Sequence, residues 1–385
     1  MSDLFFELLQ AGIWGERCVN MSVFEDYVYL QKQPIPWSII YSTAEQQDVI
    51  GPITDGISKY SESLSKRDYD SSNLVFLKPS KMDMRPFITK VVSLEDRHRL
   101  VESIIIDINR CLSSTGIEWI LVKGLELAEL YPITNHRHSC DIDLMVPFSK
   151  YAHAVSVLTG WADEVIGEET NDLEYKLLKE GICIELHGTA NMRVTGRMDR
   201  LLNSMKEDLF SNSLTRSLFL SDATEIKIPS VMFDAVYITS HLLHHFYKGG
   251  IGLKSYCDWA VFVSTFRDTI DVDTLKILLN KMDLMEEWKG LGDFAFYYLG
   301  LDWKEIPCVD VPNRVTADKL MSFIGNGFGR KRAKGVHENF WQRKTSALRI
   351  GFYDIVRAYS IFPKSSVKAL CYLLIDGGRR AIKGL

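Results

Sequence analysis

The chain has 385 residues, of which 46% are hydrophobic and 25% charged, a mixture typical of a globular protein with two or three domains. Its net charge of −5 excludes a chain that is basic throughout. Residues 330–385 nevertheless contain thirteen Lys and Arg against three Asp and Glu, so this tail carries +10 and the remainder about −15. Such a tail could contact an anionic surface weakly, although a solvated helical face is the commoner explanation.

Seven cysteines are scattered singly, without a C-x-x-C pair. This spacing argues against a disulfide framework or a thiolate zinc site and favours a reducing compartment. The N-terminal sequence MSDLFFELLQ lacks the basic segment of a secretory signal. Because no stretch of about 18 apolar residues occurs, we expect no transmembrane span. Together these features predict a cytoplasmic protein.

Residues 1–92 are predicted to form an N-terminal helical region. Apolar residues recur at helical spacing near the N-terminus and between residues 37 and 49, after which Gly51 and Pro52 interrupt the pattern. The serine-rich segment 58–73 is predicted to be a loop, because its polar residues show no apolar period.

Residues 93–229 are predicted to form a strand-rich central domain. Ser93 begins the sequence S-L-E-D, which fits a capping box, so a helix is expected from there to about Cys111. Short apolar runs bounded by glycine or proline predict strands at residues 119–122, 141–146, 174–178 and 182–187. Short helices are expected at residues 125–130 and 149–158.

Residues 230–385 are predicted to form a C-terminal helical domain with the basic tail. Helical periodicity recurs at residues 231–247, 254–266 and 271–300 and over most of 340–383. Helices therefore flank a strand-rich centre, and the simplest fold class is α+β, with a short mixed sheet between two helical regions.

Asp141 and Asp143 lie two residues apart on a predicted strand, so both side chains project from the same face. Neighbouring carboxylates repel each other unless a cation neutralises them. Mg²⁺ (or Mn²⁺) does this well when phosphate completes its shell of oxygen ligands. Taken alone, a D-x-D pair is more often a solvent-exposed acidic pair at the start of a strand.

Two neighbouring features favour the metal interpretation. Lys123 and Gly124 end a predicted strand and precede a helix, where glycine lets a phosphate approach the backbone and lysine adds charge. A surface lysine before a turn glycine is the plain alternative. On the strand 182–187, Glu185 and His187 share one face, and an acid there is costly to bury unless it is paired or bound to a metal. We predict that Glu185 completes the metal site, whereas His187 could orient an acceptor, act as a base or simply hydrogen-bond a neighbour.

The C-terminal helices carry further candidate residues for the acceptor or for support of the site. His241 and His245 are spaced i, i+4 on one helix, a spacing that binds zinc when a third ligand is present. A polar cluster that faces substrate or core is the favoured interpretation. Lys254 and Asp258 have the same spacing and are predicted to form an ordinary helix ion pair.

The quoted residues resemble a known family. The stretch I-L-V-K-G-L-E-L-A-E-L-Y-P with R-H-S-C-D-I-D-L-M-V (residues 120–146) and I-E-L-H-G (184–188) are similar to the uncharacterised nucleotidyltransferase family of the polymerase-β-like superfamily. Residues 37–57, 241–245 and 252–258 are similar as well, so the resemblance covers roughly residues 1–265. It implies a polymerase-β-like palm and, since members are often described from bacterial gene clusters, a bacterial setting.

The resemblance also implies residue roles. The paired aspartates of the family correspond to Asp141 and Asp143, and its third carboxylate corresponds to Glu185, so these three are the implied catalytic and metal residues. Lys123, Gly124 and Arg137 are the implied nucleotide-binding residues. Leu125 stands where a serine usually follows the glycine, and Arg137 could equally pair with an acidic side chain.

The implied reaction moves a nucleoside monophosphate from an NTP such as ATP to an unknown acceptor hydroxyl on a small molecule, a sugar-linked compound or a protein. Two metal ions about 3.5–4 Å apart, bridged by Asp141 and Asp143, would support it. Three alternatives remain. They are an inactive nucleotide- or partner-binding protein on the same fold, a toxin–antitoxin-type regulator that nucleotidylates a protein, and an unrelated helical binding protein.

Overall fold

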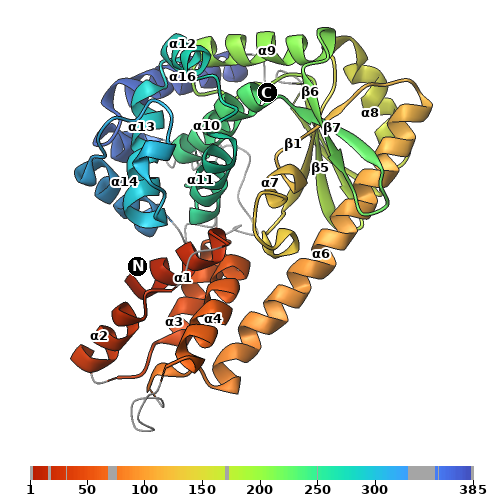
Figure 1. Ribbon diagram of the computed structural model, residues 1–385. Coiled ribbons are helices and arrows are strands. Elements are labelled where there is room, and N and C mark those ends of the chain that lie inside the picture. The colour runs from red at the N-terminus through yellow and green to blue at the C-terminus, as the bar shows by residue number, and fades with distance from the viewer. Residues whose placement is uncertain are drawn as a thin grey trace.

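The computed structural model describes residues 3–15, 19–31, 33–67, 76–169, 173–248, 250–327, 352–353 and 355–382. Within them, helices of the N-terminal region, a small sheet and helices of the C-terminal region meet around a common centre (Figure 1). The predicted α+β class with a mixed sheet is confirmed. Among the described residues, no helix has both the length and the apolar composition needed to cross a bilayer.

The N-terminal region contains α1 (Asp3–Ile13), α2 (Met21–Gln31), α3 (Trp37–Gln46) and α4 (Ile50–Ser65). The predicted loop at 58–73 is therefore wrong for residues 58–65, and residues 68–75 lie outside the described part. Pro52 is tolerated because the N–H groups of a first helical turn have no partner within the helix. Gly12 and Gly56 let α1 and α4 pack backbone to backbone, since a Cβ at Gly56 would lie 2.0 Å from the Leu8 carbonyl oxygen.

Helix α6 (Lys81–Ser114) connects the N-terminal helices to the sheet and runs diagonally across Figure 1. Its start at Ser93 was predicted wrongly, because a capping box at Ser80, thirteen residues earlier, begins the helix. The Ser80 side chain accepts a hydrogen bond from the Asp83 N–H, and the Asp83 carboxylate accepts one from the Ser80 N–H. The expected boundary at residues 92/93 thus falls inside one continuous helix.

The main sheet contains β1 (Ile120–Val122), β2 (Asp141–Met145), β3 (Glu164–Glu169), β4 (Glu174–Lys179) and β5 (Ile182–His187), in the order β1-β2-β5-β4-β3. Strands β2 and β5 are parallel and the other pairs are antiparallel. The predicted strands correspond to β1, β2, β4 and β5. Strand β3 was missed because Glu164–Glu169 is mostly polar and its Val165 and Ile166 are exposed.

Two short helices of the sheet region, α7 (Leu125–Ala128) and α8 (Tyr151–Thr159), agree with prediction. The following elements are α9 (Gly196–Ser211), β6 (Thr215–Phe219), β7 (Glu225–Pro229), α10 (Val231–Lys248), α11 (Leu253–Phe266), α12 (Val272–Met282), α13 (Met285–Phe294), α14 (Arg314–Gly327) and α16 (Pro363–Ile382). The helical segment predicted at 271–300 is helical but divided, because Asp283 adopts a left-handed conformation and ends α12 before α13 begins. Most of residues 340–362 and much of the basic tail lie outside the described part.

The close contact of α1 with α4 makes a stability prediction. Gly56→Ala should destabilise the protein by about 1–3 kcal/mol, the usual cost of overpacking, because the new methyl group meets backbone that cannot rotate away. Urea denaturation measures this change. Gly160→Ala is the matched control, since its nearest neighbour would be 3.6 Å away. Equal stability of the two variants would contradict the proposed packing.

Candidate active site

Strands β2 and β5 bring the predicted acidic residues together. Their parallel register places Asp143 opposite Glu185, and Asp141 opposite Cys183. Asp141 and Asp143 are two residues apart on β2 and therefore lie on one face of the sheet. The three acids thus come from two adjacent strands, a pairing that the structure supplies.

Asp143 is an ionised carboxylate in an almost dry environment, with 2% of its surface exposed. Its oxygens lie 3.1 Å from Lys123 Nζ and 3.1 Å from His187 Nε2. Burial would raise the pKa of Asp143, but the nearby Lys123 ammonium and the hydrogen bond from His187 lower it below its usual range. Asp143 therefore remains negatively charged at neutral pH.

Glu185 has a different environment. Its carboxylate pairs with Lys176, whose ammonium also lies 2.7 Å from Glu174. Burial and the charge of Asp143 raise the pKa of Glu185. Burial would lower the pKa of Lys176, but the neighbouring carboxylates of Glu174 and Glu185 raise it above its usual value. Lys176 thus neutralises one side of the acidic cluster.

The Lys123-Gly124 turn has an unusual backbone, with φ of 59° at Lys123 and 55° at Gly124. A left-handed conformation is disfavoured for lysine, and such conformations concentrate at functional sites. The turn points Lys123 Nζ at both Asp143 and His241, whose Nε2 lies 2.8 Å away. Burial and the Lys123 charge lower the pKa of His241, so its neutral ring accepts the hydrogen bond.

Arg137 stabilises the Lys123-Gly124 turn through a hydrogen bond to its backbone. Its guanidinium makes two hydrogen bonds to the Asp258 carboxylate, of 2.7 and 2.8 Å, and a third of 2.9 Å to the Gly124 carbonyl oxygen. Tyr131 donates a further hydrogen bond to Asp258. Arg137 is thus engaged in a buried ion pair. Asp258 pairs with Arg137 and not with Lys254, so the expected helix pair is wrong.

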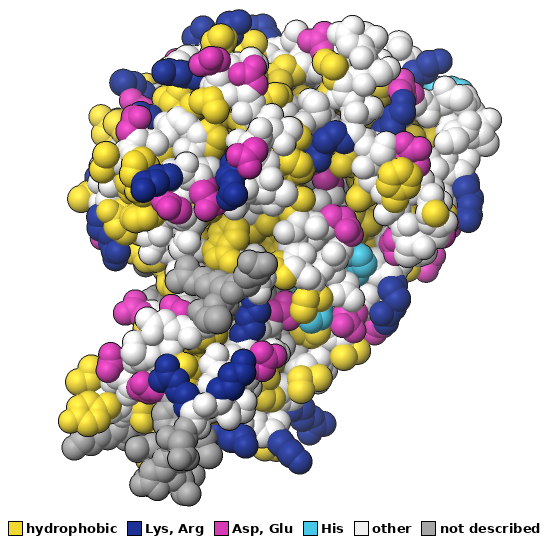
Figure 2. Space-filling view, viewed as in Figure 1, with side chains coloured by type: hydrophobic (Ala, Val, Ile, Leu, Met, Phe, Trp, Pro, Cys, Tyr) yellow, Lys and Arg dark blue, Asp and Glu magenta, His cyan; other side chains and the backbone are white. Residues whose placement is uncertain are grey.

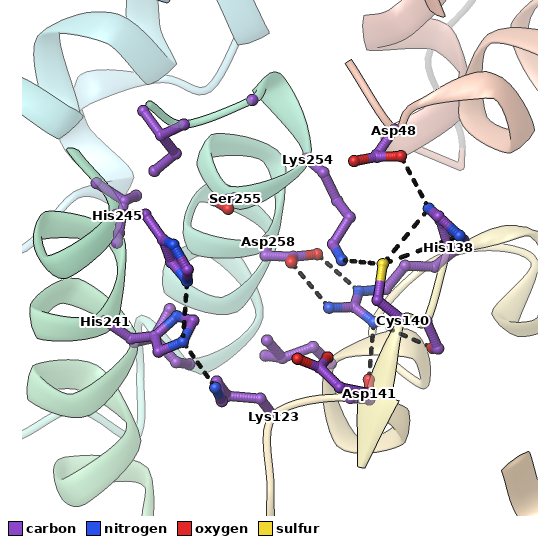
Figure 3. Close-up of a pocket in the computed structure, with 18 of the residues that line it drawn as sticks. Asp48, Lys123, His138, Cys140, Asp141, His241, His245, Lys254, Ser255 and Asp258 are labelled. Atoms are coloured by element: carbon purple, nitrogen blue, oxygen red, sulfur yellow. Dashed lines mark hydrogen bonds and ion pairs between the residues drawn. The ribbon is translucent and has the colours of Figure 1, made fainter. Parts of the chain in front are cut away.

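A cavity of about 910 Å³ opens beside these residues, where the three regions of the chain meet. The sheet region contributes Asp141, Asp143 and the Lys123-Gly124 turn, and α10 and α11 contribute His241, His245, Lys254, Ser255 and Asp258 (Figure 3). The N-terminal region contributes Glu45, Gln46 and Asp48. Every predicted site residue except Glu185 and His187 lines this cavity, and these two lie behind Asp143 on β5.

Sequence reasoning missed one cluster at the cavity wall. His138 Nδ1 lies 3.0 Å from the Asp48 carboxylate and 3.7 Å from Cys140 Sγ. Burial would raise the pKa of Cys140, but the hydrogen bond with His138 and the charge of Lys254 lower it. The R-H-S-C-D sequence before β2 offered a signal for His138 and Cys140. Nothing local pointed to Asp48, which lies 90 residues away from His138 in the chain.

The arrangement fits a divalent metal. Asp143, Glu185 and His187 each present a ligand atom, and these atoms lie within 4.8 Å of one another. Asp141 lines the cavity on the same face of β2, two residues from Asp143. Two carboxylates at the cavity wall, with the Glu185 carboxylate on the adjacent strand, provide the hard oxygen ligands that Mg²⁺ and Mn²⁺ prefer.

An acidic edge on a small mixed sheet, beside a glycine turn and a cavity, is compatible with a nucleotidyltransferase. Residues 33–289 match the family described as "Uncharacterised nucleotidyltransferase", and the chain belongs to this family. A comparison with curated proteins found no match. The crystal structure of an antigenic nucleotidyltransferase-like protein from Paracoccidioides brasiliensis is 12% identical over 48% of this chain and 90% of that chain, with a TM-score of 0.29. That score is too low to relate the two folds.

The buried ion pair yields a second stability prediction. Arg137→Gln should cost about 3–5 kcal/mol, because it leaves the buried Asp258 carboxylate without its cation. Arg110→Gln removes an exposed i, i+3 partner of Asp107 and should cost at most about 0.5 kcal/mol. Urea denaturation compares the two variants. If both variants lost the same small amount of unfolding free energy, the Arg137–Asp258 pair would not be needed for the stability of the site.

Proposed function

We propose that this chain transfers a nucleoside monophosphate from an NTP to a hydroxyl of an acceptor, using a divalent metal bound by Asp141, Asp143 and Glu185 on a polymerase-β-like palm. One observation carries the proposal. The adjacent parallel strands β2 and β5 bring three acids together, and two of them, Asp141 and Asp143, line a cavity of about 910 Å³ that is large enough for a nucleotide. Family membership supports the same class of reaction.

The charge states of the acids support this function. Asp143 is already ionised and fixed between Lys123 and His187, so it is oriented before any ligand arrives. Asp141, in contrast, has no ion pair or side-chain hydrogen bond with the described residues, although it faces the cavity. A carboxylate in this position can bind a cation, and a bound Mg²⁺ or Mn²⁺ would supply positive charge to the phosphates and acidify the acceptor hydroxyl.

The other residues of the site hold this geometry. Arg137 fixes the Gly124 carbonyl oxygen and therefore the turn beside β2. His187 donates to Asp143 and so orients its carboxylate, which makes it a positioning residue. Gly124 borders the cavity, where the absence of a side chain leaves room for a phosphate group. His241 and His245 face the cavity from α10 and are placed to contact the acceptor or the nucleotide.

Metal binding can be tested without knowledge of the acceptor. Mn²⁺ together with an NTP should raise the thermal midpoint, because a ligand at about 100 times its Kd stabilises the folded state by about 2.7 kcal/mol. EDTA should reverse the rise. Thermal denaturation with each of the four NTPs measures it. If no NTP and no divalent ion changed the midpoint, a helical binding protein without a nucleotide site would be the better description.

Asp141→Asn is the sharpest test of catalysis. Since Asp141 has no partner among the described residues, this substitution removes a metal ligand without breaking an ion pair. Pyrophosphate release should fall by about 100-fold or more, whereas the thermal midpoint without metal should be unchanged. Asp268→Asn, at a side chain 92% exposed, is the matched control and should keep full activity.

Asp143→Asn and Glu185→Gln should also abolish transfer. Each breaks an ion pair, with Lys123 or Lys176, so each variant needs a check of its fold. Product mass identifies the nucleotide moved and the acceptor. Full activity of Asp141→Asn would remove this residue from the metal site, and an active fold without any of the three acids would refute the proposed chemistry.

A further inference from the structure

We infer that Lys254, at the start of α11, binds the phosphates of the nucleotide in this cavity, and that the nucleotide therefore bridges the sheet and the C-terminal helices. This inference rests on the proposed function and deepens it. Sequence similarity assigned phosphate binding to the Lys123-Gly124 turn. The distribution of charge around the cavity assigns it mainly to Lys254.

The cavity contains several positive groups, and most of them are neutralised within the protein. Lys90 lies 3.3 Å from Glu45, Lys123 lies 3.1 Å from Asp143, and Arg137 lies 2.7 Å from Asp258. His138 is likewise paired with Asp48, at 3.0 Å. Each of these cations therefore already has a carboxylate partner, which reduces its attraction for a polyanion.

Lys254 differs from them. It lines the cavity, yet it forms no ion pair with any residue in the part of the chain that the structure describes, and its ammonium group donates a hydrogen bond to Cys140 Sγ at 3.9 Å. A thiol is a weak acceptor for an ammonium group. Among the lysines and arginines around the cavity, Lys254 therefore has a positive charge that is available to an anion.

Asp141 provides the complementary observation. It is the carboxylate of the cavity wall that has no ion-pair partner within the described ranges, so the cavity carries one available charge of each sign. Figure 3 shows Asp141 at the start of β2 and Lys254 on α11 around the same opening. A metal–triphosphate complex has matching charges, because the cation would meet Asp141 and the phosphate oxygens would meet Lys254.

The side chains of α11, and not its backbone, make this contact. The Leu253 and Lys254 N–H groups already donate to the Gln47 side-chain and backbone oxygens, at 3.0 and 3.3 Å. The Ser255 hydroxyl also lines the cavity and offers a second donor beside Lys254. Outside the cavity, the face in Figure 2 mixes Lys and Arg with Asp and Glu, so the exterior there offers no single-sign field to attract the nucleotide.

The test is equilibrium binding of inorganic tripolyphosphate and of ATP, each with Mg²⁺, by calorimetry on the full chain. Lys254→Met should weaken tripolyphosphate binding at least about tenfold, because a charge-assisted hydrogen bond is lost. Lys254→Arg should restore much of the affinity. Binding of adenosine, which has no phosphate, should not change. In turnover, Lys254→Met should raise KM for the NTP more than it lowers kcat.

Lys90→Met is the matched control, because it removes a lysine of the same cavity whose charge Glu45 already neutralises. Its affinity for tripolyphosphate should stay within about twofold of the original. Lys254→Met with unchanged affinity and KM would overturn the inference, as would a failure of the unmodified chain to bind either probe. If Lys254 proved necessary for binding while no NTP released pyrophosphate, the proposed transferase activity would fail and the phosphate site would stand.

Discussion

The buried pair of Arg137 and Asp258 is the interaction on which the site depends. Arg137 precedes β2 and Asp258 belongs to α11, so the pair joins the sheet to the C-terminal helices across 121 positions of sequence. The same guanidinium binds the Gly124 carbonyl oxygen. A buried ion pair of this kind adds little net stability, but losing one member leaves an uncompensated charge. Its effect is to fix one arrangement of the turn, β2 and α11 around the cavity.

Pairing with basic side chains explains how the folded protein accommodates the acidic edge without a bound metal. Three carboxylates on neighbouring strands would destabilise the fold if all were unneutralised. Lys123 and His187 compensate Asp143, and Lys176 compensates Glu185. Only Asp141 is left open to the cavity among these described acids. Two of the three carboxylates are thus paired with basic side chains of the protein, and the third is available to a ligand.

The sequence predicted the acids because a strand has a simple period. Side chains at i and i+2 share a face, so Asp141 and Asp143 could be placed on one face of their strand, and Glu185 and His187 on one face of another, without tertiary information. The strand order and the parallel β2–β5 register were needed to bring Glu185 opposite Asp143, and the sequence alone did not supply them. The capping-box rule gave a wrong helix start where two sequences fitted it. The S-L-E-D motif at Ser93 lies within α6, and the capping box that begins the helix is at Ser80.

The ion-pair partner of Asp258 was harder to predict from the sequence than the acidic residues. Lys254 and Asp258 have ideal helical spacing, which is why an ordinary i, i+4 pair was expected. A bidentate arginine in a dry environment is a stronger partner for a carboxylate than a lysine one turn away, so Asp258 pairs with Arg137. The Arg137–Asp258 pair also affects the ion pairing of the neighbouring Lys254. Because Arg137 pairs with Asp258, Lys254 has no carboxylate within ion-pair distance among the described residues, and its positive charge lines the cavity in which we propose that a nucleotide binds.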